Sequence, residues 1–131
     1  MLEPIHLLSA LLEDREGIAF EVLSSVADAD AIGREVRREL ASLPGATGES
    51  VAEPQPSQAM LNVISAAGAK AQERGDDYVS TEHLLLGLAE NEGRVGKILR
   101  DAGANDKKLR QAIKKIRGDA KVTSPNPEAT F

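Results

Sequence analysis

The sequence contains no cysteine and no tryptophan, and only one tyrosine and two phenylalanines stand among its 131 residues. Without cysteine, disulfide bonds and thiolate metal sites are excluded, and the composition suits a reducing compartment such as the cytoplasm. Because aromatic side chains are so scarce, the core has to be built from leucine, isoleucine, valine and alanine. At this length a single domain can bury roughly two thirds of the surface of its unfolded chain, which is enough for a stable core.

Long apolar runs and an excess of positive charge are also lacking. No segment approaches the roughly 20 apolar residues that a membrane-spanning helix needs, and the N-terminus lacks the basic and apolar stretches of a signal peptide. The formal net charge is −5, which opposes binding to duplex nucleic acid, because that affinity comes mainly from Lys and Arg neutralising phosphates. We therefore expect a cytoplasmic protein that binds neither membranes nor nucleic acid, with a helical DNA-binding protein as the least favoured alternative.

A phrase near the N-terminus is repeated later in the chain. The stretch LEPIHLLSALLED, which begins at Leu2, returns with small changes as VSTEHLLLGLAEN, which begins at Val79. In both copies, and in the two stretches that follow each of them, apolar residues recur at i, i+3, i+4 and i+7, which is typical of amphipathic helices. The pattern predicts an all-α protein with two copies of a three-helix unit, over residues 2–43 and 78–118. A further helix is expected over 57–74, before the second copy.

Local signals indicate where these helices begin and end. Residues suited to begin a helix are Pro4, Ser57, Ser80, Asp106 and one of Asp28 and Asp30. Gly75 fits the left-handed position after the helix at 57–74. The expected buried face of that helix comprises Met60, Val63, Ile64, Ala67 and Ala71. Residues 44–56 are rich in proline, glycine and small polar residues and predict a linker, while 119–131, with two prolines and no periodicity, predicts an extended tail.

Residues with catalytic or metal-binding chemistry do not form a recognisable set. His6 and His83 occupy equivalent positions in the two copies, but neither has further ligands at metal-site spacing, so we expect both to pack or hydrogen-bond at helix starts. The stretch GRVGK at 93–97 lacks the spacing and the Ser or Thr of a phosphate-binding loop. No Ser-His-Asp or Cys-His arrangement is visible. The sequence therefore predicts a non-catalytic protein without cofactor or metal.

The segment AIKKIRGDAK, residues 112–121, is locally basic. Cations at a helix C-terminus are favoured by the helix dipole, and this is the interpretation that we prefer. Contact with nucleic acid is the weaker alternative.

Several motifs taken together resemble one known family. The stretch YVSTEHLLLGLAE from Tyr78, the doubled three-helix unit, the QPSQ entry into the helix at 57–74 and VTSPNPEATF at 122–131 look like the N-terminal domain of the ClpB disaggregases, AAA+ chaperones of the Clp family. The STEHLL motif is shared by the whole Clp N-domain family, whereas the entry and exit segments point to the ClpB branch. The resemblance covers residues 2–131.

The resemblance implies two helical repeats, about seven helices in all, related by a pseudo-twofold axis. It also implies that the domain engages unfolded or aggregated polypeptide through an apolar groove, within a hexameric ATPase that works with the DnaK chaperone. Acidic positions that the family uses for substrate engagement correspond to Asp76 and Glu82, and the groove would draw on Leu61 and Ile64. Plainer interpretations are a solvated turn for Asp76, pairing with the helix dipole for Glu82, and core packing for Ile64.

The chain departs from the family pattern at both ends. The first helix of the first repeat is absent, and the chain stops at Phe131, before the first ATPase module. Without that helix, we expect Leu7, Leu8 and Leu11 to form an exposed apolar patch. We also expect the repeat at 2–43 to open before the second repeat. Self-association through this patch is one alternative role, and docking of adaptor proteins, as in protease-associated Clp ATPases, is another.

Overall fold

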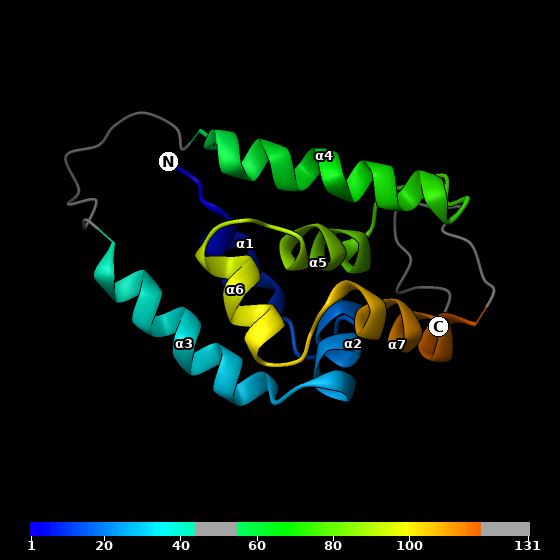
Figure 1. Ribbon diagram of the computed structural model, residues 1–131, viewed down its shortest axis with the longest axis horizontal. Helices are drawn as coiled ribbons and strands as arrows, with labels where there is room; N and C mark the ends of the chain where they lie inside the picture. The colour runs from blue at the N-terminus through cyan, green and yellow to red at the C-terminus, as the bar shows by residue number, and fades with distance from the viewer. Residues whose placement is uncertain (44–54, 119–131) are drawn as a thin grey trace.

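A computed structural model describes residues 1–43 and 55–118, which form seven α-helices and no β-strand. The helices, in chain order, are α1 (Pro4–Glu13), α2 (Ile18–Val26), α3 (Ala29–Ser42), α4 (Gln58–Glu73), α5 (Thr81–Ala89), α6 (Arg94–Asp101) and α7 (Asp106–Arg117). Figure 1 shows α4 as a long outer helix that lies across α5, with α1 to the left of α5 and with α2 and α7 below it in that view. The predicted all-α fold is confirmed. Most of the expected linker, 44–54, and the expected tail, 119–131, lie outside the described residues.

Most helix starts use the predicted capping residues. The hydroxyl of Ser57 accepts a hydrogen bond from the N–H of Met60 at 3.0 Å, and of the two candidates for α3 it is Asp28 that caps, accepting from Ala31 at 3.1 Å. The last helix differs from the prediction, because Asn105 is its N-cap and Asp106 is its first helical residue. The physical reason is that the carboxylate of Asp106 accepts a hydrogen bond from Arg110, one turn ahead in the helix, so that the side-chain amide of Asn105 caps the helix in its place.

The two copies of the repeated phrase share an unusual cap. In α1 the N–H of Glu3 donates to Nδ1 of His6 at 2.9 Å, and in α5 the N–H of Ser80 donates to Nδ1 of His83 at 2.8 Å. Each imidazole therefore satisfies a backbone donor that the helix itself leaves unpaired. The predicted role of both histidines at helix starts is confirmed.

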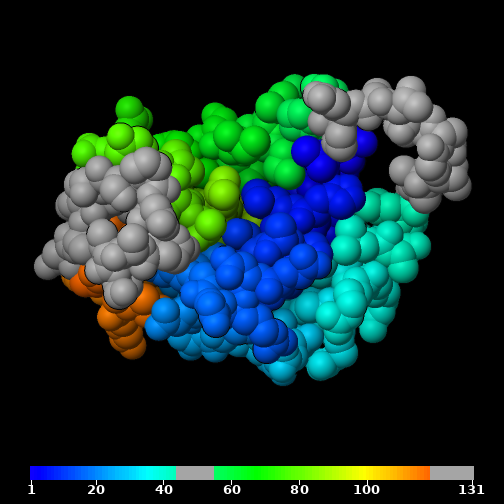
Figure 2. Space-filling view, turned by 180° about the vertical axis from the view of Figure 1, so that it is seen from behind, coloured from blue at the N-terminus to red at the C-terminus, as the bar shows by residue number. Residues whose placement is uncertain are grey.

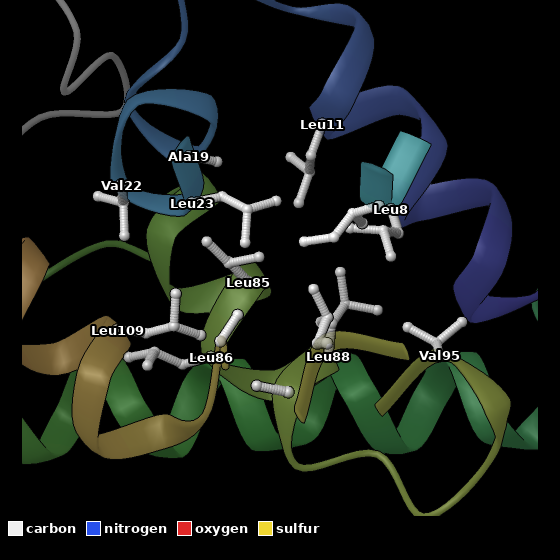
Figure 3. Close-up of a cluster of buried hydrophobic side chains, with 14 of the residues drawn as sticks. Leu8, Leu11, Ala19, Val22, Leu23, Leu85, Leu86, Leu88, Val95 and Leu109 are labelled. Carbon is white, nitrogen blue, oxygen red and sulfur yellow. The ribbon is translucent and has the colours of Figure 1, made fainter. Parts of the chain in front are cut away.

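The core is aliphatic and centres on α5. Figure 3 shows leucine side chains of α5 meeting side chains that come from α1, α2 and α7. Side chains with less than 2% exposure include Leu8, Leu23, Ile32, Leu85, Leu86, Leu88, Leu99, Leu109 and Ile113. Because these residues come from both halves of the sequence, the two repeats share one core and neither is a separate domain.

The helices α4 and α5 pack unusually closely. A Cβ atom at Gly87 would lie 2.7 Å from the carbonyl oxygen of Val63, so the two backbones approach at a distance that only glycine permits. The equivalent residue of α1 is Ala10, which is exposed. Among the described residues no helix covers α1 in the way that α4 covers α5, and Figure 2 shows α1 open at the surface between α4 and α3.

Two predictions about burial were wrong. Leu8 and Leu11 are only 0% and 9% exposed, so the expected exposed patch on α1 does not form. The reason is that the leucine face of α1 packs against the shared core, while the uncovered face carries the small residues Ser9 and Ala10. Ile64, which we assigned to the buried face of α4, is 47% exposed. At about 100° per residue it stands at the edge of the buried arc of that helix.

Candidate functional site

A groove of about 620 Å³ runs beside α4 and is bordered by the start of α1, the end of α3 and the turn from α5 to α6. Its apolar lining residues are Pro4, Ile5, Leu43, Ala59, Val63, Ala66 and Val95. Its charged lining residues are Glu3, Glu39, Glu90, Glu92 and Arg94. The groove therefore combines an apolar floor with a rim that is mainly acidic.

Ion pairs tie down parts of this rim. Arg94 Nε donates to Oε1 of Glu39 at 2.9 Å, which joins α6 to α3 beside the groove. Glu90 pairs with Lys70, whose ammonium also lies 3.3 Å from the carboxylate of Asp106. Burial works to lower the pKa of Lys70, but the hydrogen bond that Lys70 donates to Glu90 and the charges of both carboxylates raise it above its ordinary value. The rim is thus held by charged contacts that salt weakens only partly.

Leu61 and Ile64 lie together on the outer face of α4, one helical turn apart. Their exposed fractions are 45% and 47%, and neither lines the groove, which lies on another flank of the helix. The sequence from Gln55 to Ala69 contains no charged residue, although 28% of the whole chain is charged. The N-terminal part of α4 therefore presents an uncharged strip with two exposed aliphatic side chains.

Asp76 and Glu82 are brought together, but away from that strip. With a rise of 1.5 Å per residue, the length of α4 separates Leu61 from the helix end near Asp76 by roughly 18 Å. The side chains of Asp76 and Glu82 are both 0% exposed. The plainer interpretation of Asp76 as a solvated turn residue is therefore wrong, while Glu82 does stand in the first turn of α5.

Arg117, the last residue of α7, neutralises both carboxylates. One of its terminal nitrogens lies 2.9 Å from Oδ1 of Asp76, and the other lies 3.4 Å from Oε1 of Glu82. Sequence reasoning missed this role: it assigned the basic end of α7 to the helix dipole, as solvated cations on an outer face, with nucleic-acid contact as the weaker alternative, and for the buried Arg117 the solvated position is wrong. One signal was available, since Arg117 follows Ile113 by one turn and so falls on the buried face of the helix. An arginine at such a position needs a buried carboxylate partner.

His83 completes this cluster. Because its Nδ1 accepts from the N–H of Ser80, the proton sits on Nε2, which lies 2.7 Å from Oδ2 of Asp76 and donates to it. Burial lowers the pKa of the imidazole below its ordinary value, and the hydrogen bond and charge of Asp76 oppose this only in part. The ring therefore stays neutral and links the helix cap to the buried carboxylate.

Two classes of site are not found in the part of the chain that the structure covers. Within 1–43 and 55–118, no group of three or more His, Asp or Glu side chains could hold a metal ion. In the same ranges, every helix is too short or too polar to span a membrane.

The sequence matches the Clp repeat (R) N-terminal domain family over residues 1–102. The chain belongs to this family. It is 47% identical to the chaperone protein ClpB of Mycobacterium tuberculosis and 37% identical to that of Corynebacterium glutamicum, in each case over 131 residues that make up 99% of this chain and 15% of the relative. The chain thus spans about one seventh of the length of these ClpB relatives.

A solved structure has the same fold. The N-terminal domain of Hsp104 from Candida albicans superposes with a TM-score of 0.78 at 24% sequence identity, and the match covers 95% of this chain and 81% of that one. The predicted Clp N-domain architecture is therefore confirmed. The four candidate residues Asp76, Glu82, Leu61 and Ile64 stay predictions as contacts for a ligand, because no polypeptide is bound in the structure.

Proposed function

We propose that this Clp N-terminal domain is a non-catalytic binding module, which engages unfolded or aggregated polypeptide for an ATP-dependent disaggregase. The observation that carries the proposal is the uncharged strip of α4, where Leu61 and Ile64 are about half exposed, together with an apolar groove of about 620 Å³ on the other flank of the same helix. Contiguous exposed apolar surface on a folded monomer often marks a binding site. An extended chain that crosses the outer face of α4 could contact the strip on one flank and the groove on the other.

Binding of this kind is expected to be weak and tolerant of sequence. Covering the exposed half of Leu61 and of Ile64 contributes roughly 1 kcal/mol each, half of the full burial of such a side chain. The apolar floor of the groove adds further contacts without hydrogen bonds that would demand one sequence. Its glutamates, including Glu3 and Glu92, disfavour acidic segments. Weak binding suits a module that has to release its captured segment.

The wider context is part of the same proposal. The relatives are named ClpB chaperones and are about seven times longer than this chain, so ATP hydrolysis would belong to regions outside the domain. We infer a cytoplasmic hexamer that works with the DnaK chaperone, in which this domain makes the first contact with the client.

The test is an NMR titration of the 131-residue chain with reduced and carbamidomethylated lysozyme, an unfolded basic protein. We expect chemical shift changes to cluster on the outer face of α4 and along the groove. The double variant L61S/I64S should bind about tenfold to thirtyfold more weakly, because it loses roughly 2 kcal/mol of apolar contact. Shift changes that are absent, or that scatter over helices remote from α4, would count against the proposal.

A further inference from the structure

A buried ionic cluster stands beside an exposed apolar loop between α4 and α5. We propose that this cluster, formed by Asp76, Glu82 and Arg117, holds Tyr78 and Val79 (the loop pair) as a second apolar contact for extended polypeptide. In this assignment Asp76 and Glu82 are positioning residues, and the loop pair touches the bound chain. The inference rests on the proposed function and extends it to a second surface, on the loop between α4 and α5.

The way in which α4 ends fixes the loop on its N-terminal side. Gly75 has a φ of +73°, and the N–H of Asp76 donates to the carbonyl oxygen of Ala71 at 2.9 Å, which turns the chain sharply. The turn directs the carboxylate of Asp76 inward. There Arg117 donates to Oδ1 at 2.9 Å, and Nε2 of His83 donates to Oδ2 at 2.7 Å.

Ser80 fixes the loop on its C-terminal side. It is 6% exposed, its N–H donates to Nδ1 of His83 at 2.8 Å, and its hydroxyl hydrogen-bonds to the carboxylate of Glu82. Arg117 lies 3.4 Å from the same carboxylate. The loop pair therefore stands between two buried polar anchors, and it can move only if charged hydrogen bonds inside the protein break.

The other repeat indicates that folding does not need these charges. Counted from the helix N-caps, Ile5 of α1 corresponds to Glu82 of α5, and Leu40 of α3 corresponds to Arg117 of α7. The helices α1 and α3 pack together as α5 and α7 do. Replacement of a buried ion pair by an apolar pair often leaves the free energy of unfolding unchanged or raises it. The pair of Glu82 and Arg117 is therefore better explained by a role in holding the loop than by a contribution to stability.

The loop pair suits a short extended segment rather than a folded partner. Tyr78 and Val79 are 46% and 48% exposed, which offers on the order of 200 Å² for contact. A stable interface between folded proteins buries roughly 800 Å² on each partner. Asp77 is exposed beside the pair and favours a basic residue in the bound chain. The occupant that fits is an extended segment with apolar and basic side chains.

The contact itself is tested with the double variant Y78S/V79S of the 131-residue chain. Binding of fluorescein-labelled, reduced and carbamidomethylated lysozyme is followed by anisotropy. We expect the dissociation constant to rise about tenfold while the melting temperature falls by only a few degrees, because about half of each side chain is exposed. An unchanged dissociation constant would refute the assignment of the loop pair.

Positioning is tested with the triple variant D76A/E82I/R117L, which carries the apolar pair of the first repeat. We expect it to melt cooperatively, a few degrees below the wild-type temperature because the buried Nε2–H of His83 loses its acceptor, and to bind about tenfold more weakly, with faster amide exchange at residues 77–79. Wild-type binding by this variant would refute the positioning role. If the triple variant fails to fold, the single variant D76N gives the same two readouts. E73Q is the matched control, because Glu73 is an exposed carboxylate paired with Arg110 near the end of α4, and it should bind normally.

The outcomes separate the two proposals. If the wild-type chain did not bind the unfolded lysozyme, both the proposed function and this inference would be refuted. Weakened binding in L61S/I64S with intact binding in Y78S/V79S would sink only this inference.

Discussion

Replacement of Arg117 by methionine isolates the energetic role of the buried cluster. The side chain of Arg117 is 1% exposed and faces two carboxylates that are 0% exposed. Methionine has a similar length and fills the space, so no large cavity forms. What remains is a pair of buried carboxylates without their principal cation, and removal of one partner from a buried ion pair typically costs about 3–5 kcal/mol.

The structure favours the lower end of this range. Asp76 keeps its hydrogen bond from His83 at 2.7 Å and the approach of Arg74 at 3.6 Å, and Glu82 keeps the hydroxyl of Ser80. We therefore expect R117M to lower the free energy of unfolding by about 3 kcal/mol, out of the roughly 5–15 kcal/mol that holds a domain of this size folded.

Urea unfolding followed by far-UV circular dichroism measures this change. With a slope of roughly 1–3 kcal/mol per molar urea, the midpoint should fall by about 1–3 M. The matched control is K115M, which removes an exposed cation from the same last turn of α7 and should change stability by less than about 0.5 kcal/mol. If R117M shifted the midpoint no further than K115M, the cluster could not be a buried, charge-balanced unit.

Two further predictions concern packing and protonation. G87A should lower the free energy of unfolding by about 1–3 kcal/mol, because its methyl group would meet the carbonyl oxygen of Val63 at 2.7 Å. G68A has open space around it and should raise the free energy of unfolding by up to about 1 kcal/mol. Equal effects of the two variants in thermal melts would contradict the close approach of α4 and α5. His83 has a pKa below its unfolded value of about 6.5, so its contribution to stability is fully present above pH 6.5 and is lost as the pH falls through the lower, folded-state pKa. An NMR titration should show a ring that is mainly neutral at pH 6.5, with the proton on Nε2, and a pKa at or above 6.5 would be inconsistent with its burial.

Features set by neighbours in the sequence could be predicted. Ser57 begins α4 as a cap, Gly75 takes a positive φ at its end, and both equivalent histidines stand at helix starts. Each depends on the position of one residue relative to a helix terminus, where the backbone N–H and C=O groups that lack a partner within the helix need a hydrogen bond. The same local logic predicted helix number and order, because a helical stripe of apolar residues is visible in a single chain.

Features that depend on which elements meet could not be predicted in this way. The periodicity of α4 places Ile64 near the buried arc of that helix. Ile64 is exposed because α5 contacts α4 along a neighbouring line of residues, and the sequence pattern of α4 does not show where that line runs. Similarly, the leucines of α1 face the shared core because α5 of the other repeat is there to receive them. The pairing of Asp76 with Arg117 joins residues 41 positions apart in the chain. No local pattern encodes such a partner, although an arginine on a buried face signals that one exists.

The duplication separates what the fold requires from what a binding role adds. Features present in both repeats, such as the histidine caps, serve the construction of the shared core. Features present in only one repeat cannot be needed to build the unit, since the other copy builds it without them. The buried charges of Glu82 and Arg117 fall in this second class, because Ile5 and Leu40 stand in their places. Gly87 also falls there, with Ala10 as its counterpart, and it is the residue that seats α4 on α5. The differences between the copies thus converge on α4 and the loop that follows it, which is where both proposed polypeptide contacts lie.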